Sequence, residues 1–146
     1  MKKTVKSIVS ALAMLALVCA LVFAFASCKD GDAQTDVWEN AKYSSQTELG
    51  EGAKALTLEV KAEQRTVTFT VNTDCDTVGE ALLECGLISG EEGPYGMYIK
   101  EVNGIVADYE TDGTYWALYI NGEYAMTGVD TTEITEGAVY QLVREK

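Results

Sequence analysis

Two short segments of the sequence alternate apolar and polar residues. Residues 55–61 place leucine or valine at every second position, and residues 66–71 repeat this pattern with Val67, Phe69 and Val71 between threonines. A period of two puts all the apolar side chains on one face of a strand. Only residues 62–65 separate the two segments, so we predict an antiparallel hairpin.

A helix is predicted next, from Thr77 to Cys85. Thr77 can cap its first turn, and Glu80 follows three residues later, where a capping box has its acidic residue. Gly86 stands where the C-cap of a helix favours glycine. Apolar residues recur at helical spacing and form one stripe, which comprises Val78, Ala81, Leu82 and Cys85.

Strands and turns are predicted for the rest of the chain. Residues 87–96 are predicted to be a loop, which holds the only proline, Pro94. Asn103-Gly104 and Asn121-Gly122 each lie between apolar runs, a pattern typical of tight hairpin turns because both positions tolerate positive φ. The strands around them are expected over residues 97–102, 114–120 and 138–144. Together these elements predict an α+β domain over residues 55–146, with a β-grasp-like, mainly antiparallel sheet and one helix packed on it.

The N-terminus has the pattern of an export signal. Three lysines in the first six residues precede an apolar run over residues 8–26. The sequence Phe25-Ala26-Ser27-Cys28 resembles the lipobox of bacterial lipoproteins, in which the cysteine is acylated after cleavage. We therefore expect a signal helix and signal peptide over residues 1–27 and lipidation of Cys28. An uncleaved signal anchor is the alternative, because the apolar run is long enough to span a bilayer.

Both alternatives place the domain outside the cytoplasm, held at the cell membrane by a lipid anchor or a signal anchor. Residues 28–54 are polar and show no lasting period, so a flexible tether is expected there. Trp38 within it would be an isolated apolar residue or a docking point for a partner.

Charge and composition exclude several classes of function. Beyond residue 27 the chain has 8 basic and 23 acidic residues, a net charge of −15, which would repel a nucleic acid. The sequence has no histidine, so it lacks the commonest general base and the commonest metal ligand. No nucleophile or phosphate-loop motif is present. We therefore expect no enzyme, no required cofactor and no metal site.

Two further patterns, a pair of cysteines and a run of acidic residues, could each be a chemical site or an ordinary structural feature. Cys75 and Cys85 could form a disulfide, as cysteines in exported proteins often do. The helix predicted between them would hold the sulfurs too far apart, which favours two thiols.

Residues 108–113 place acids at positions one, three and five of a calcium loop, but Tyr119 stands where the bidentate glutamate belongs. A solvated turn is therefore expected there.

Aromatic residues crowd into one third of the domain. In the strand predicted over residues 114–120, alternate side chains face opposite ways, so one set covers the core and the other can be exposed. Exposed rings with hydroxyls suit a flat, partly apolar ligand, whereas core filling is the alternative. The crowded residues are Tyr95, Tyr98, Tyr109, Tyr115, Trp116, Tyr119 and Tyr124.

From Thr77 onward the sequence resembles the transcobalamin-like C-terminal domain family. These bacterial domains, mostly of unassigned function, are similar to the β-domain of transcobalamin and intrinsic factor. The segments that carry the resemblance are TVGEALL at 77–83, GPYGMYI at 93–99, VNG at 102–104, YWALYING at 115–122 and AMTGV at 125–129.

The resemblance implies a β-grasp-like sheet whose surface closes over one side of cobalamin. The animal carriers bind cobalamin between this domain and a large helical domain, so a second domain or a transporter from another chain would complete the site. By position, the residues that would face the corrinoid are Tyr98, Tyr115, Trp116, Tyr124, Met126, Thr127, Gly128 and Val129.

The leading expectation is a membrane-tethered, extracytoplasmic binding lipoprotein that captures cobalamin or a related corrinoid for uptake. The alternative is a non-catalytic protein- or glycan-interaction module at the cell surface. A structural domain without a small ligand is a third interpretation.

Overall fold

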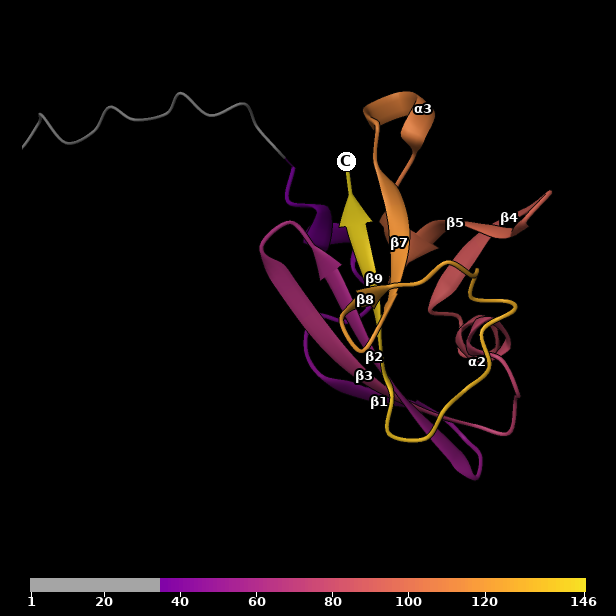
Figure 1. Cartoon of the computed structure of the whole chain (residues 1–146). Helices are drawn as coiled ribbons and strands as arrows, with labels where there is room; N and C mark the ends of the chain where they lie inside the picture. Colours follow the sequence, from indigo (N-terminus) through magenta and orange to yellow (C-terminus); the bar gives the residue numbers. More distant parts are fainter. Residues whose placement is uncertain (1–34) are drawn as a thin grey trace, which may run out of the picture. The chain divides into compact units, whose positions relative to one another are not determined.

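The computed structural model describes residues 35–146, which Figure 1 shows as two β-sheets with short helices. These residues form one unit, Thr35–Lys146, rich in strands and poor in helix, which confirms the predicted α+β class. The predicted signal peptide over residues 1–27 and the predicted lipidation site Cys28 lie outside the described residues. Within residues 35–146, no helix is both long and apolar enough to cross a membrane.

The predicted hairpin is confirmed as β2 (Lys54–Ala62) and β3 (Arg65–Thr73), which pair along their whole length with Leu58 opposite Phe69. The apolar residues of both strands are buried on one face, as their period of two requires. Burial of each such leucine or phenylalanine contributes about 1.5–3 kcal/mol to folding. This face of the hairpin forms one side of the hydrophobic core.

The hairpin holds the second and third positions of a six-stranded sheet in the order β1-β3-β2-β9-β7-β8, in which β1 is Thr47–Gly50. The C-terminal strand β9 (Val139–Glu145) runs parallel to β2, and β7 (Tyr115–Ile120) pairs antiparallel with β9. The Asn121-Gly122 turn, with φ of 51° and 84°, leads to β8 (Glu123–Tyr124) and confirms the predicted tight turn.

A second, three-stranded sheet contains β4 (Ile88–Gly93), β5 (Gly96–Val102) and β6 (Ile105–Val106). The loop predicted over residues 87–96 is therefore wrong: most of it is a strand paired antiparallel with β5. Only Ile88 of β4 is buried, so backbone pairing rather than alternating apolar residues defines this strand. The Asn103-Gly104 turn between β5 and β6 has two positive φ angles, as predicted.

The predicted helix is α2 (Val78–Glu84), and its caps are those expected from the sequence. The Thr77 side chain accepts a 3.3 Å hydrogen bond from the Glu80 amide. At the other end Gly86 has φ of 67°, and the Leu87 amide donates to the Leu82 carbonyl, which is a Schellman motif. The apolar stripe of α2 is buried in the core, apart from the half-buried Cys85.

The segment before β2 is part of the domain. It contains a short 3-10 helix, η2 (Val37–Asn40), and an edge strand, β1 (Thr47–Gly50), parallel to β3. Trp38 is only 5% exposed, its Nε1 donates a 3.0 Å hydrogen bond to the Ala62 carbonyl, and the Arg65 guanidinium lies 4.9 Å from its ring centroid. The flexible tether predicted over residues 28–54 is therefore wrong for residues 37–50. These residues are held by contacts with distant parts of the chain, which a local sequence pattern does not reveal.

Cys75 and Cys85 are both free and half-buried, as the geometric argument predicts. Cys75 Sγ contacts a carboxylate oxygen of Glu84 at 3.3 Å, and Cys85 Sγ contacts the Leu82 carbonyl at 3.5 Å. Burial raises the pKa of the Cys85 thiol, so it stays protonated at neutral pH.

Candidate functional site

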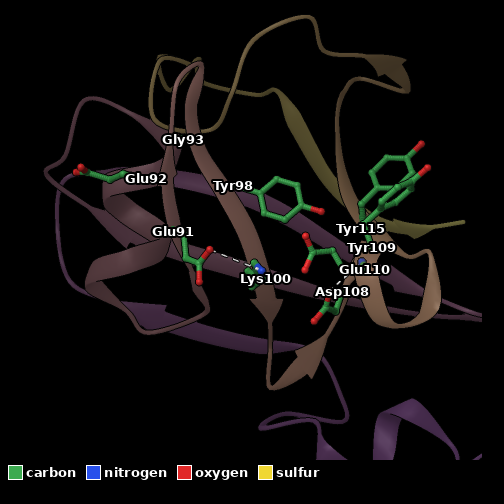
Figure 2. A pocket seen from close by; sticks show the side chains of 9 residues that line it. All are labelled: Glu91, Glu92, Gly93, Tyr98, Lys100, Asp108, Tyr109, Glu110 and Tyr115. Atoms are coloured by element: carbon green, nitrogen blue, oxygen red, sulfur yellow. Dashed lines mark hydrogen bonds and ion pairs between the residues drawn. The ribbon is translucent and has the colours of Figure 1, made fainter.

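An open groove of about 560 Å³ lies between β5 and β7 and is bordered by β4 and by the one-turn helix α3 (Tyr109–Asp112). Figure 2 shows the side chains that line it. Its volume is within the range of small-molecule sites in proteins. The lining residues are Glu91, Glu92, Gly93, Tyr98, Lys100, Asp108, Tyr109, Glu110 and Tyr115. We call this the tyrosine groove.

Three tyrosines enter the tyrosine groove from three different elements. Ile99 of β5 is buried, so the strand turns its neighbours Tyr98 and Lys100 away from the core and toward the groove. Tyr115 begins β7, and Tyr109 begins α3. Tyr98 is 41% exposed and Tyr109 is 65% exposed, so both rings are available to a ligand. In Figure 2 the Tyr98 hydroxyl points toward the side that carries Tyr109, Glu110 and Tyr115.

Helix α3 is short, and polar contacts at both ends fix it. The Asp108 side chain accepts a 3.0 Å hydrogen bond from the Glu110 amide, and Gly113 ends the helix with φ of 73°. Asp112 accepts a hydrogen bond from the Thr114 amide and lies 2.7 Å from Nη2 of Arg144 on β9. These contacts place Tyr109 and Glu110 at the mouth of the tyrosine groove.

The tyrosine groove is acidic. Four carboxylates and one ammonium group line it, which gives a formal charge of −3. The Lys100 Nζ lies 3.7 Å from a Glu91 carboxylate oxygen and 5.6 Å from the centroid of the Tyr98 ring. A cation therefore already lies over one of the three rings.

One carboxylate, Glu145, anchors two tyrosines of β7. The Tyr115 hydroxyl donates a 3.0 Å hydrogen bond to Glu145 Oε2, and the Tyr119 hydroxyl donates a 2.5 Å hydrogen bond to Oε1. These hydrogen bonds raise the pKa of both tyrosines, because each phenolate would form beside a negative charge. Tyr119 also makes an edge contact with Tyr124, with ring centroids 5.5 Å apart.

The structure divides the predicted site residues into two groups. Tyr98 and Tyr115 line the tyrosine groove. Tyr124 of β8 and Met126 just after it do not line the groove, but their side chains are 57% and 91% exposed. Thr127 is also exposed, and its hydroxyl lies 3.0 Å from that of Thr132.

Trp116 and Val129 do not face a ligand. Trp116 is only 8% exposed and Val129 only 2%, and both belong to the hydrophobic core. Trp116 alternates with Tyr115 along β7 and so points to the opposite face. Its proposed contact with a corrinoid is therefore wrong. Gly128 is half-buried, and its carbonyl accepts a 2.7 Å hydrogen bond from the Thr132 hydroxyl.

The loop that carries Met126 is tied to the strand that carries Tyr98. A carboxylate oxygen of Asp130 accepts a 3.3 Å hydrogen bond from the Met97 amide. Gly96 has φ of 108°, which favours glycine, and a Cβ atom there would lie 2.7 Å from the same carboxylate. The predicted residues of β5 and of the 126–130 loop therefore belong to neighbouring surfaces.

Seven of the nine lining residues were not among the predicted site residues, namely Glu91, Glu92, Gly93, Lys100, Asp108, Tyr109 and Glu110. The crowding of aromatic residues was a signal for Tyr109, but nothing in the sequence placed it opposite Tyr98. The acids of residues 108–113 cap α3 and contact Thr114 and Arg144, as expected of a polar turn. Among residues 35–146, no three acidic or cysteine side chains are grouped so that they could hold a metal ion.

Comparison with known proteins supports the fold assignment. Residues 75–139 match the family model "Domain of unknown function (DUF4430)". A protein from Ruminococcus gnavus ATCC 29149, provisionally described as metal-binding, superimposes with a TM-score of 0.61 and 29% identity over 64% of this chain and 98% of its own. Haptocorrin in complex with Cbi superimposes with a TM-score of 0.54 and 20% identity over 64% of this chain and 25% of its own. The comparison with curated protein sequences gave no match.

The described residues thus share the fold of the matched haptocorrin domain, in agreement with the resemblance seen in the sequence. The matched part of haptocorrin is only a quarter of that protein. The shared feature is the fold of this one domain.

Proposed function

We propose that this protein is a non-catalytic ligand-binding lipoprotein whose domain binds a corrinoid. One observation carries the proposal: in a transcobalamin-like domain, tyrosines from three elements line one open groove. The neighbour haptocorrin was solved in complex with Cbi, a corrinoid, which supports this ligand class. The β2–β3 hairpin, the α2 helix and the mainly antiparallel pairing of the strands also support the β-grasp-like assignment.

The chemistry of the surface suits such a ligand. A corrin is broad and apolar, and its rim carries amides that tyrosine hydroxyls can hydrogen-bond. Tyr98 and Tyr115 would provide these hydroxyls, and the exposed thioether of Met126 would cover apolar area. The chain has no histidine that could ligate cobalt, so the ligand would be held by its periphery.

The site would be completed by a second protein. The groove is open, and the haptocorrin part that matches this domain is a quarter of that chain. A ligand held from one side loses binding energy that a second wall would supply. We propose that a transporter or a separate binding protein supplies this wall during uptake.

Membrane attachment belongs to the same proposal. Acylation of Cys28 after cleavage would hold the domain outside the cytoplasm, where it could collect a ligand. Replacement of Cys28 by alanine should release the protein from the membrane fraction. Unchanged retention would instead support an uncleaved signal anchor.

A protein- or glycan-interaction module is the second candidate. Strand β4 is an edge of its sheet and its last five residues are exposed, so its outer side could pair with an extended partner. Tyr95, 96% exposed at the tip of the β4–β5 hairpin, would add an aromatic contact.

Equilibrium dialysis of residues 29–146 against cobalamin and cobinamide tests the proposal, with the corrin absorbance as the readout. Saturable binding is expected, and Tyr98→Ala should weaken it at least about fivefold, which corresponds to roughly 1 kcal/mol. Tyr95→Ala is the matched control, because Tyr95 is exposed but does not line the groove. No retention of either corrinoid, or equal effects of Tyr98→Ala and Tyr95→Ala, would overturn the proposal.

A further inference from the structure

The tyrosine groove combines exposed aromatic rings with an excess of negative charge that a neutral ligand does not need. Glu91 has Lys100 as its ion-pair partner, whereas Asp108 and Glu110 have no ion-pair partner within residues 35–146. Both flank Tyr109 in the sequence and border the same hollow. No ion pair in the described part of the chain neutralises these two carboxylates, which follow a segment held beside β5 by a 2.9 Å hydrogen bond from the Ala107 amide to the Lys100 carbonyl.

Aromatic faces attract cations because the ring quadrupole is negative above the ring plane. The structure contains one such contact in this hollow, between Lys100 Nζ and the Tyr98 ring. Tyr109 and Tyr115 offer two further rings on the far side, where no lysine or arginine lines the groove. An alkylammonium group carries the positive charge and the apolar methyl groups that aromatic rings and carboxylates recognise.

We propose that the tyrosine groove is a binding site for a small organic cation that carries an alkylated ammonium group, held by Tyr98, Tyr109 and Tyr115 and neutralised by Asp108 and Glu110. This goes beyond the corrinoid proposal and does not depend on it, although Tyr98 and Tyr115 take part in both. The charge of −3 also selects against ammonium groups attached to an anion. The site is therefore for the free cation rather than for a phosphorylated headgroup.

Choline is a suitable probe, and residues 29–146 are a suitable protein because they contain the whole described unit with its core. Binding is followed by NMR titration of the tyrosine ring resonances at low ionic strength. Dimethylbutanol, the uncharged carbon isostere of choline, tests the charge. Phosphocholine tests the effect of an attached anion. We expect saturation by choline in the millimolar range, with at least about fivefold weaker binding of both other compounds.

Matched variants locate the site. Tyr109→Leu should weaken choline binding about three- to fivefold, whereas Tyr109→Phe, which keeps the ring, should preserve it. Glu110→Gln should weaken binding about two- to threefold. Glu123→Gln removes the same charge from an exposed residue outside the groove and should leave the affinity unchanged.

One variant should act in the opposite direction. Lys100→Met removes the cation that lies over the Tyr98 ring, so it should tighten choline binding at least about twofold. Lys61→Met, on the six-stranded sheet, is the control for the change in net charge.

Three results would overturn the proposal. They are equal binding of choline and dimethylbutanol, equal effects of Glu110→Gln and Glu123→Gln, and no saturable shift of the tyrosine resonances up to about 100 mM choline, far above a millimolar Kd. Each leaves the corrinoid dialysis unaffected, so failure of this inference and failure of the proposed function are distinguishable.

Discussion

Tyr115 and Glu145 lie directly opposite each other on β7 and β9, and the Tyr115 hydroxyl donates a 3.0 Å hydrogen bond to the Glu145 carboxylate. The second oxygen of that carboxylate accepts the hydroxyl of Tyr119. Tyr115 also lines the tyrosine groove. One acidic residue of the C-terminal strand therefore fixes an aromatic wall of the candidate site.

Glu145→Gln should lower the pKa of Tyr115 and Tyr119 toward the ordinary tyrosine value. The carboxylate raises both pKa values through its hydrogen bonds and its charge, and an uncharged amide removes most of this effect. A titration of phenolate absorbance at alkaline pH measures the change. Glu123→Gln is the control, and an identical titration curve for Glu145→Gln and the unchanged protein would contradict the assignment.

The same two tyrosines make stability depend on alkaline pH. Their pKa values are higher in the folded domain than in the unfolded chain, so the unfolded chain releases these protons first. Their contribution is therefore complete below the ordinary tyrosine pKa and is lost as pH rises through the folded values. Urea denaturation at a series of alkaline pH values should show a shallower decline for Glu145→Gln than for the unchanged protein.

Trp116 should behave as a core residue. Trp116→Ala is expected to lower the free energy of unfolding by about 3–5 kcal/mol, because it removes a large buried side chain. Tyr98→Ala, on the exposed side of β5, should change it by about 0.5 kcal/mol or less. Urea denaturation followed by circular dichroism measures both. A Trp116→Ala variant as stable as the unchanged protein would place Trp116 on the surface after all.

The end of α2 depends on a backbone conformation that glycine adopts easily. Gly86 has φ of 67°, and a Cβ there would meet no atom within 4 Å. Gly86→Ala should therefore cost about 1 kcal/mol of stability through backbone strain alone. Gly86→Asn should cost less, because asparagine tolerates this region. Equal losses for both variants in thermal unfolding would contradict this explanation.

Cys75 and Cys85 should both be alkylated under denaturing, non-reducing conditions. The structure has two free thiols, so mass spectrometry of residues 29–146 should show two added groups. Under native conditions Cys85 should react slowly, since burial raises the pKa of its thiol. An unmodified mass after denaturation would indicate a disulfide.

Sequence patterns predicted the elements whose burial is periodic or whose turns need special residues. The β2–β3 hairpin, the α2 caps and the two Asn-Gly turns are local features, and each was predicted from a few neighbouring residues. Strand β4 was missed because its stability comes from backbone pairing with β5, and only Ile88 of its six residues is buried. Trp38 was misplaced for a similar reason: its partners, Ala62 and Arg65, are far away in the sequence.

The candidate site was only partly predictable. The alternation of side chains along β7 predicted that Tyr115 and Trp116 lie on opposite faces of the strand. It did not predict which of the two faces the hydrophobic core covers. The core covers the Trp116 face, with Leu118 beside it. Tyr109 could not be assigned from the sequence, because its place opposite Tyr98 depends on how α3 approaches β5. That approach is a tertiary relationship, set by contacts such as Asp112 with Arg144.

We infer that the tyrosine groove is the binding surface of this domain. NMR chemical-shift mapping of residues 29–146 with cobinamide tests it most directly, because it locates the ligand without any substitution. We expect the largest shifts at Tyr98, Tyr109 and Tyr115, with smaller ones at Met126. Shifts confined to the threonines of β3, three strands away from β7 in the six-stranded sheet, would contradict it.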